Sequence, residues 1–230
     1  MRLDKMLSHM GYGSRKEVKE FIRKGYVSVN GIQIKDDDYK VNEVEDEILF
    51  FDESLHYEKM VYILLNKPAG YVSATYDAYD PTVIDLIREY QKGIFPVGRL
   101  DKDTTGLLLI TNDGKLAHNL LSPSKHVNKI YEFTFSGNFD LTFYSKFQQG
   151  IVLDDGYQCL PAKIEVDESQ HGFITIQEGK YHQVKRMFEA LGLKITSLKR
   201  VSFGSLNLPP DLREGQYIYL TKSEIEQLFS

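Results

Sequence analysis

The chain has 230 residues, a formal net charge of −5 and a single cysteine. With 42% hydrophobic and 27% charged residues, it has the composition of a soluble globular protein of one or two domains, which excludes disorder throughout. Because Cys159 alone can form neither an internal disulfide nor a thiolate metal cluster, a cytoplasmic location is expected. The N-terminus lacks the apolar core of a secretory signal, and no apolar run is long enough to span a membrane.

Charge is distributed unevenly along the first 60 residues. Residues 1–35 carry eight lysines and arginines against three acids, a net +5, whereas residues 36–60 carry ten acids against two lysines, a net −8. This contrast is typical of a small basic binding module followed by a linker. Uneven surface charge without a function is the alternative.

The basic segment predicts two short helices and a hairpin. Apolar residues at helical spacing end at Gly11, and Ser14 with Glu17 forms a capping box that opens a second helix. Alternating strands over 27–29 and 32–34 flank Asn30-Gly31, a strong signal for a tight turn. Basic residues on or near the second helix could neutralise RNA phosphates, unless they form only a solvated face. These residues are Arg15, Lys16, Lys19, Arg23 and Lys24.

Beyond a linker predicted over residues 53–60, helices and strands are mixed irregularly. Strands are expected at 61–65, 106–111, 131–135 and 173–176, and helices at 183–191 and 223–229. Two further helices are expected to begin at Pro81 and after Asn112-Asp113-Gly114. Without a steady alternation of strand and helix, the predicted fold class is α+β, with domains at 1–52 and 61–230.

The motif search excludes several kinds of chemistry. No phosphate-binding loop of the Walker type and no nucleophile elbow is present, and the six histidines lack the spacing of zinc ligands. No metal and no cofactor is therefore expected. The chemistry would come from carboxylate, hydroxyl, imidazole and basic side chains.

Two polar stretches are unusual. The run Gly98-Arg-Leu-Asp-Lys-Asp-Thr-Thr-Gly106 leads directly into a buried strand, and the polar, basic run from Glu178 to Met187 enters a helix. An aspartate in such a loop is most often a turn or capping residue. Taken together, the two runs suggest a shared site, because Lys185 or Arg186 could keep a buried aspartate of the first run ionised.

These runs resemble the pseudouridine synthases of the ribosomal small-subunit synthase A family. The shared motifs are G-R-L-D-x-D-T-T-G-L-L-L, the following T-N-D-G, K-x-Y at Lys129-Ile-Tyr131, Asn66-Lys67-Pro68-x-Gly70-Tyr71 and the run that ends at Met187. The basic head resembles the alpha-L RNA-binding module of that family. The resemblance covers essentially the whole chain and implies a catalytic domain with a mixed, largely antiparallel sheet.

The resemblance also implies roles for single residues. Asp101 is expected to be the nucleophile, Lys185 the cation that pairs with it, and Tyr131 the residue that stacks on the uracil, unless Tyr131 is only a core residue. Arg99 would help to hold the flipped-out nucleotide, unless it pairs with Asp103. Further RNA contacts are expected from Lys180, His182, Gln183 and Arg186, in a segment over 176–200 that carries a net charge of +4. Lys180 stands where the family often has arginine, so it would bind phosphate without a bidentate fork.

The expected partner is ribosomal RNA or a small-subunit ribonucleoprotein assembly intermediate, bound by a monomer. Three other readings remain open at this point. The target could be large-subunit RNA, the protein could be a non-catalytic ribosome-assembly factor, or Asp101 and Asp103 could form the carboxylate pair of a glycosidase.

Overall fold

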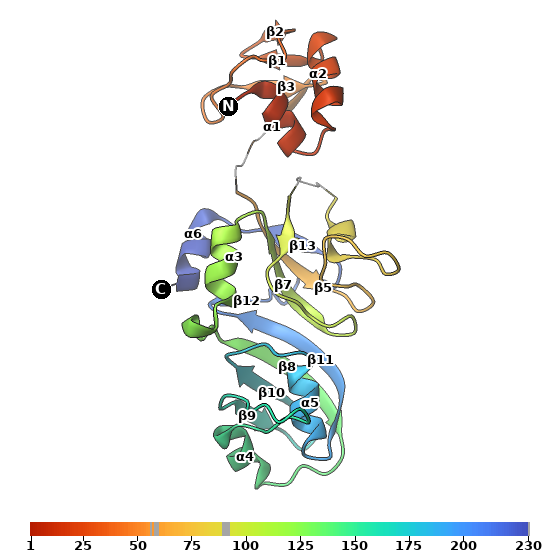
Figure 1. The fold of residues 1–230 in the computed structure, drawn as a ribbon, viewed down its shortest axis with the longest axis vertical. Coiled ribbons are helices and arrows are strands. Elements are labelled where there is room, and N and C mark those ends of the chain that lie inside the picture. The colour runs from red at the N-terminus through yellow and green to blue at the C-terminus, as the bar shows by residue number, and fades with distance from the viewer. Residues whose placement is uncertain (56, 58–59, 89–92, 230) are drawn as a thin grey trace. The chain divides into compact units, whose positions relative to one another are not determined.

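The computed structural model describes residues 1–55, 57, 60–88 and 93–229, which form two compact units (Figure 1). The smaller unit is built mainly from Met1–Val61, and the larger from Tyr62–Ile87 and Phe95–Ser230. In these described parts of the chain, no helix is both long and apolar enough to cross a membrane.

The smaller unit consists of two helices and a four-stranded antiparallel sheet. The helices are α1 (Leu3–His9) and α2 (Arg15–Arg23), and the strand order is β2 (Ile32–Ile34), β1 (Val27–Val29), β3 (Ile48–Phe50) and β4 (Glu53–Leu55). The capping box of Ser14 and Glu17 is present, and Asn30 and Gly31 both take positive φ at the hairpin. Both helices and the hairpin confirm the prediction, because each signal lies within a few consecutive residues.

The segment that follows the hairpin departs from the expectation of a linker. The acidic residues after Ile34 connect β2 to β3 inside the smaller unit, and residues 53–55 pair with β3 as strand β4. The linker predicted over 53–60 is therefore wrong for those three residues, and His56, Glu58 and Lys59 lie outside the described residues. Burial of Ile48 and Phe50 against the helices holds β3 in place despite its acidic surroundings.

The larger unit is built on a mixed sheet that is largely antiparallel, as the fold class predicted. Seven strands follow one another in the order β13, β5, β7, β11, β8, β10, β9, while β6 pairs with β7 and β12 with β11. The strands are β5 (Tyr62–Lys67), β6 (Phe95–Pro96), β7 (Thr105–Thr111), β8 (Lys129–Ser136), β9 (Lys163–Val166), β10 (His171–Ile176), β11 (Lys194–Phe203), β12 (Leu206–Asn207) and β13 (Tyr217–Tyr219).

Helices lie beside both halves of this sheet (Figure 1). The α-helices are α3 (Gly114–Leu121), α4 (Phe143–Gln149), α5 (Gln183–Glu189) and α6 (Lys222–Glu226), and short 3-10 helices span Val83–Leu86, Pro123–Lys125 and Gln227–Phe229. Asp113 caps α3 by accepting from two backbone N–H groups. The helix expected after Pro81 is only one 3-10 turn.

Strand β11 was not predicted, although it joins the two halves of the sheet. Its sequence, Lys-Ile-Thr-Ser-Leu-Lys-Arg-Val-Ser-Phe, has no regular alternation of apolar and polar residues. The strand pairs with β8 on one side and with β7 on the other, so its neighbours rather than its own pattern fix it.

The contact between β7 and β11 is the one parallel pairing between the described strands, and Gly106 makes it possible. Thr105 and Gly106 lie opposite Lys199 and Arg200, and Gly106 has a φ of +98°. A Cβ atom there would lie 2.7 Å from the backbone nitrogen of Arg200 and closer still to its carbonyl oxygen. Glycine therefore allows the strand that follows the Asp101 loop to approach β11.

We expect Gly106→Ala to destabilise the larger unit by at least ~3 kcal/mol, because it adds a backbone clash to an unfavourable φ. Gly156→Ala is the matched control, since Gly156 has a similar φ of +83° but open space around its Cβ position. Its cost should be near ~1 kcal/mol. Denaturant unfolding followed by circular dichroism measures both, and equal losses would contradict the role given to Gly106.

Candidate active site

Asp101 lies in the loop between β6 and β7, and a buried lysine ties this loop to the sheet. Lys67 ends strand β5, is 0% exposed, and donates to three carbonyl oxygens, those of Pro68 at 3.0 Å, Lys102 at 3.2 Å and Thr104 at 2.9 Å. Two of the three belong to residues that flank Asp101 closely. The motif Asn66-Lys67-Pro68 predicts no role for Lys67, although a lysine at the end of an apolar strand is a usable signal of a buried anchor.

A second set of bonds fixes the same loop from the segment after β5. The Ser73 hydroxyl donates to the carbonyl of Leu100 at 2.9 Å and accepts from the Leu100 N–H at 3.0 Å. The Gly70 N–H donates to the carbonyl of Lys102 at 2.8 Å. The backbone is thus held by hydrogen bonds on both sides of Asp101, and those on the Leu100 side are buried.

Helix α5 supplies the cation that faces Asp101. The Lys185 ammonium lies 2.9 Å from one Asp101 oxygen and 2.6 Å from Asp103, and Nε2 of His182 lies 3.6 Å from the other Asp101 oxygen. Burial alone would lower the pKa of Lys185, but Asp103 and Asp101 outweigh it and raise that pKa above its ordinary value. Lys185 therefore stays charged, and its ammonium faces the Asp101 carboxylate.

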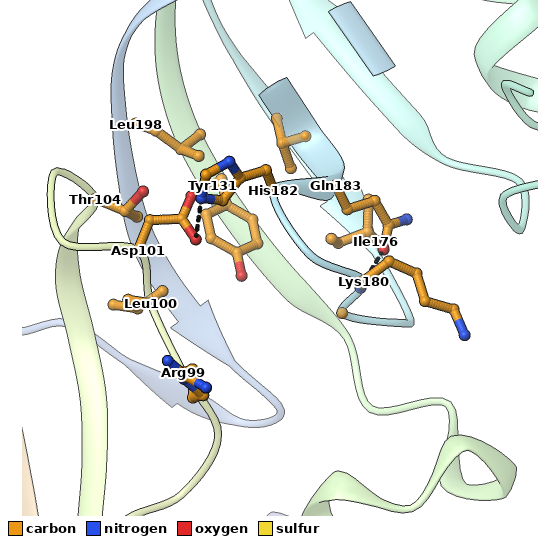
Figure 2. Close-up of a pocket in the computed structure, with 12 residues that line it drawn as sticks. Arg99, Leu100, Asp101, Thr104, Tyr131, Ile176, Lys180, His182, Gln183 and Leu198 are labelled. Carbon is orange, nitrogen blue, oxygen red and sulfur yellow. Dashed lines mark hydrogen bonds and ion pairs between the residues drawn. The ribbon is translucent and has the colours of Figure 1, made fainter. Parts of the chain in front are cut away.

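Asp101 opens onto a cavity that Tyr131 also lines (Figure 2). Tyr131 lies on β8 with only 8% of its surface exposed. Apolar side chains from β10, α5, β11 and the Asp101 loop contribute to the wall, and Lys180 and Gln183 lie at the end opposite Asp101 (Figure 2). The cavity is lined by Arg99, Leu100, Asp101, Thr104, Tyr131, Ile176, Gly179, Lys180, His182, Gln183, Val184 and Leu198.

The structure brings most of the predicted catalytic-domain residues together. For Gln183 and Arg186, however, the side chains contact other groups of the protein. Gln183 lines the cavity but is buried, donates to Glu178 at 2.8 Å and accepts from the Lys180 N–H at 2.9 Å, so it holds the loop in shape. The Arg186 guanidinium pairs with Asp154 and, at 2.7 Å, with Asp155. Two acids within the protein thus engage its charge, whereas the sequence predicted that Arg186 contacts RNA.

Arg99 lies on the rim of the cavity and does not form the ion pair that was the alternative to a nucleotide contact. An ion pair with Asp103 was the competing expectation, but Asp103 pairs with Lys185 instead. The Arg99 side chain is exposed. It is therefore accessible to a bound nucleotide.

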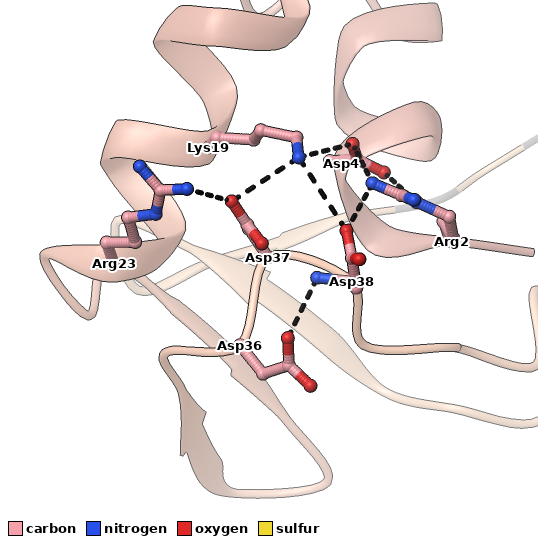
Figure 3. A network of polar contacts seen from close by, with 7 residues as sticks. All are labelled: Arg2, Asp4, Lys19, Arg23, Asp36, Asp37 and Asp38. Carbon is pink, nitrogen blue, oxygen red and sulfur yellow. Dashed lines mark hydrogen bonds and ion pairs between the residues drawn. The ribbon is translucent and has the colours of Figure 1, made fainter.

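In the smaller unit, acids neutralise part of the predicted basic face of α2 (Figure 3). Lys19 lies 3.4 Å from Asp37 and 3.9 Å from the buried Asp4, and Arg23 lies 2.6 Å from Asp37. Arg2 closes the network on Asp4 and Asp38. Lys19 and Arg23, which the sequence predicts as phosphate contacts, are thus engaged by the acidic segment that folds back onto α2.

Other cations of the stripe remain open. Arg15, Lys16 and Lys24 are exposed, and they form no ion pair with the described residues. The basic face thus separates into cations engaged in the fold and cations open to solvent.

Comparison with known proteins agrees with this geometry. The profile of the family described as RNA pseudouridylate synthase matches residues 61–190, and that of the S4 domain matches residues 1–48. An RNA pseudouridine synthase of Bacillus subtilis is 44% identical over 99% of this chain and 98% of its own. The ribosomal small subunit pseudouridine synthase A of Haemophilus influenzae is 39% identical over 99% of each chain.

Two further relatives bear on the fold and on the target. The ribosomal large subunit pseudouridine synthase B of Bacillus subtilis is 37% identical over 99% of this chain and 95% of its own. A crystal structure of a pseudouridylate synthase superposes with a TM-score of 0.70, with 38% identity and 99% of each chain covered.

The buried Lys67 makes the activity sensitive to alkaline pH. Burial lowers the pKa of Lys67 to about 8, so its ammonium loses a proton as the pH rises through 8 and keeps two N–H groups for three carbonyls. We expect turnover to fall as the pH rises through 8, because the Asp101 loop loosens, and this fall forms an alkaline limb in the pH profile. A pH profile of the initial rate measures it, and Lys67→Met should lose activity at all pH values and lack the limb.

Stability should respond in the opposite sense. The pKa of Lys67 is lower in the folded chain than the ordinary value of 10.5, so the unfolded chain binds the proton more tightly between pH 8 and 10.5. Deprotonation of Lys67 therefore favours folding over that range. A loss of activity that follows a drop in melting temperature would contradict the assignment.

Proposed function

Because the chain belongs to the RNA pseudouridylate synthase family, we propose that it converts a uridine of ribosomal RNA into pseudouridine with Asp101 as the nucleophile. The observation that carries this proposal is the Asp101–Lys185 ion pair at 2.9 Å, at a cavity that also holds the ring of Tyr131. In the reaction the N1–C1′ bond breaks and a C5–C1′ bond forms. The C5 hydrogen leaves as a proton and N1 gains one, so no oxidant or reductant is needed.

Each residue at the cavity has a chemical task in this proposal. The Asp101 carboxylate attacks the nucleotide, and its negative charge stabilises positive charge that develops at C1′. Lys185 pairs with that carboxylate and holds it toward the cavity, and Tyr131 offers its ring to the uracil and its hydroxyl as a proton acceptor. The target must leave the RNA stack before Asp101 can reach it, and Arg99 is placed at the rim to hold the flipped nucleotide.

Small-subunit RNA is the proposed target. Support comes from the relatives named ribosomal small subunit pseudouridine synthase A. The substrate is naked RNA or a small-subunit assembly intermediate. Mapping pseudouridines in ribosomal RNA from a strain that lacks the gene tests this. A pseudouridine missing only from large-subunit RNA would show that large-subunit RNA is the substrate. If no pseudouridine is missing, a non-catalytic assembly factor is favoured.

We expect Asp101→Asn to abolish tritium release from C5-labelled uridine in ribosomal RNA, because the amide keeps the shape but removes the charge. Folding and RNA affinity should stay near those of the wild type. Asp103→Asn is the matched control, since Asp103 also contacts Lys185 but is 74% exposed. It should keep activity within about tenfold, and an Asp101→Asn enzyme within tenfold of the wild type would contradict the assignment.

For the smaller unit, we expect the combined change of Arg15, Lys16 and Lys24 to alanine to flatten the slope of log affinity against log salt by about 2. Each lost phosphate contact removes ~0.7–0.9 from that slope. Binding titrations of small-subunit RNA over a salt series measure it.

The double change of Lys19 and Arg23 to alanine is the control for this experiment. These residues are engaged by Asp4 and Asp37, so their loss should lower thermal stability and leave the salt slope nearly unchanged. An unchanged slope in the first variant, or a larger fall in the second, would contradict the division of the basic face.

A further inference from the structure

An exposed pair of stacked rings stands beside the cavity and has no part in the chemistry described so far. The rings of Tyr181 and His182 lie parallel, with centroids 3.8 Å apart and planes inclined by 17°. His182 covers one face of the tyrosine ring, and yet Tyr181 is 76% exposed. The open face of the Tyr181 ring can accept a further ring in an offset stack.

The backbone around the pair is held in an unusual conformation. His182 is the residue before α5 and takes a left-handed conformation with a φ of +49°, which is rare for a residue with a side chain. The Arg186 guanidinium donates to the carbonyl of Tyr181 at 3.3 Å, and Gln183 bridges Glu178 and the Lys180 N–H. Strain of this kind persists where the surroundings fix it, and it concentrates at functional sites.

His182 connects the pair to the reacting group. Its Nε2 lies 3.6 Å from an Asp101 oxygen, and both residues line the same cavity (Figure 2). Lys180 precedes the pair and also lines this cavity, while its ammonium lies 4.3 Å from the centre of the Tyr157 ring. Aromatic and basic groups thus alternate along the rim next to Asp101.

We propose that the Tyr181–His182 pair is a stacking platform for the base that neighbours the target uridine in the RNA strand. This rests on the proposed function, because a flipped uridine leaves its neighbour without a stacking partner. Single-stranded RNA is commonly bound by stacking its bases on exposed aromatic rings. The platform positions the strand so that the flipped nucleotide enters the cavity beside Asp101, and its function depends on the ring rather than on the tyrosine hydroxyl.

The test compares Tyr181→Ala with Tyr181→Phe. The substrate is ribosomal RNA from a strain that lacks the gene, labelled with tritium at C5 of uridine. We expect the alanine variant to lose about tenfold to a hundredfold in kcat/KM through a higher KM, with kcat and melting temperature near those of the wild type. The phenylalanine variant should stay within about twofold, because it keeps the ring.

Tyr79→Ala is the control for loss of an exposed ring, since Tyr79 is 96% exposed and forms no ring stack with the described residues. It should behave as the wild type. Equal losses in Tyr181→Ala and Tyr79→Ala, a Tyr181→Ala enzyme within twofold of the wild type, or a Tyr181→Phe enzyme as weak as the alanine variant would each overturn the platform. Absence of tritium release with the wild-type protein would instead overturn the proposed function.

Discussion

The ion pair between Asp101 and Lys185 is the interaction around which the larger unit is arranged. Asp101 comes from the loop before β7 and Lys185 from α5, and these elements meet because β7 pairs with β11 and α5 packs beside β11. The two side chains are 25% and 19% exposed, so they are shielded without being fully desolvated. A fully buried pair would cost more in lost hydration than its attraction returns.

Lys67 is a second cation near Asp101, and it acts on the backbone of the Asp101 loop rather than on the carboxylate. Lys67 is fully buried, and its ammonium is satisfied by three backbone carbonyls rather than by a carboxylate. Its charge therefore fixes the backbone near Asp101 without neutralising the Asp101 carboxylate. Lys67 holds the loop in place, and Lys185 pairs with the carboxylate that the loop carries.

The smaller unit shows how misleading a charge count can be. Its basic N-terminal segment and the acidic segment after it suggested a module and a linker, yet Asp37 and Asp38 return to α2 and pair with Lys19 and Arg23. Arg15, Lys16 and Lys24 form no such pairs among the described residues and remain exposed. Fewer cations of this face are thus free of acidic partners than the charge count suggests.

The sequence by itself determined the capped helix α2, the Asn30-Gly31 hairpin and the strand that follows the Asp101 loop, because each depends on interactions within a few residues. The motifs also identified Asp101, Tyr131 and Lys185 as one site. Only the tertiary structure decided that β11 joins the sheet, that Lys67 anchors the loop and that Arg186 pairs with acids. These depend on groups far apart in the chain, whose partners become neighbours only after the sheet has formed.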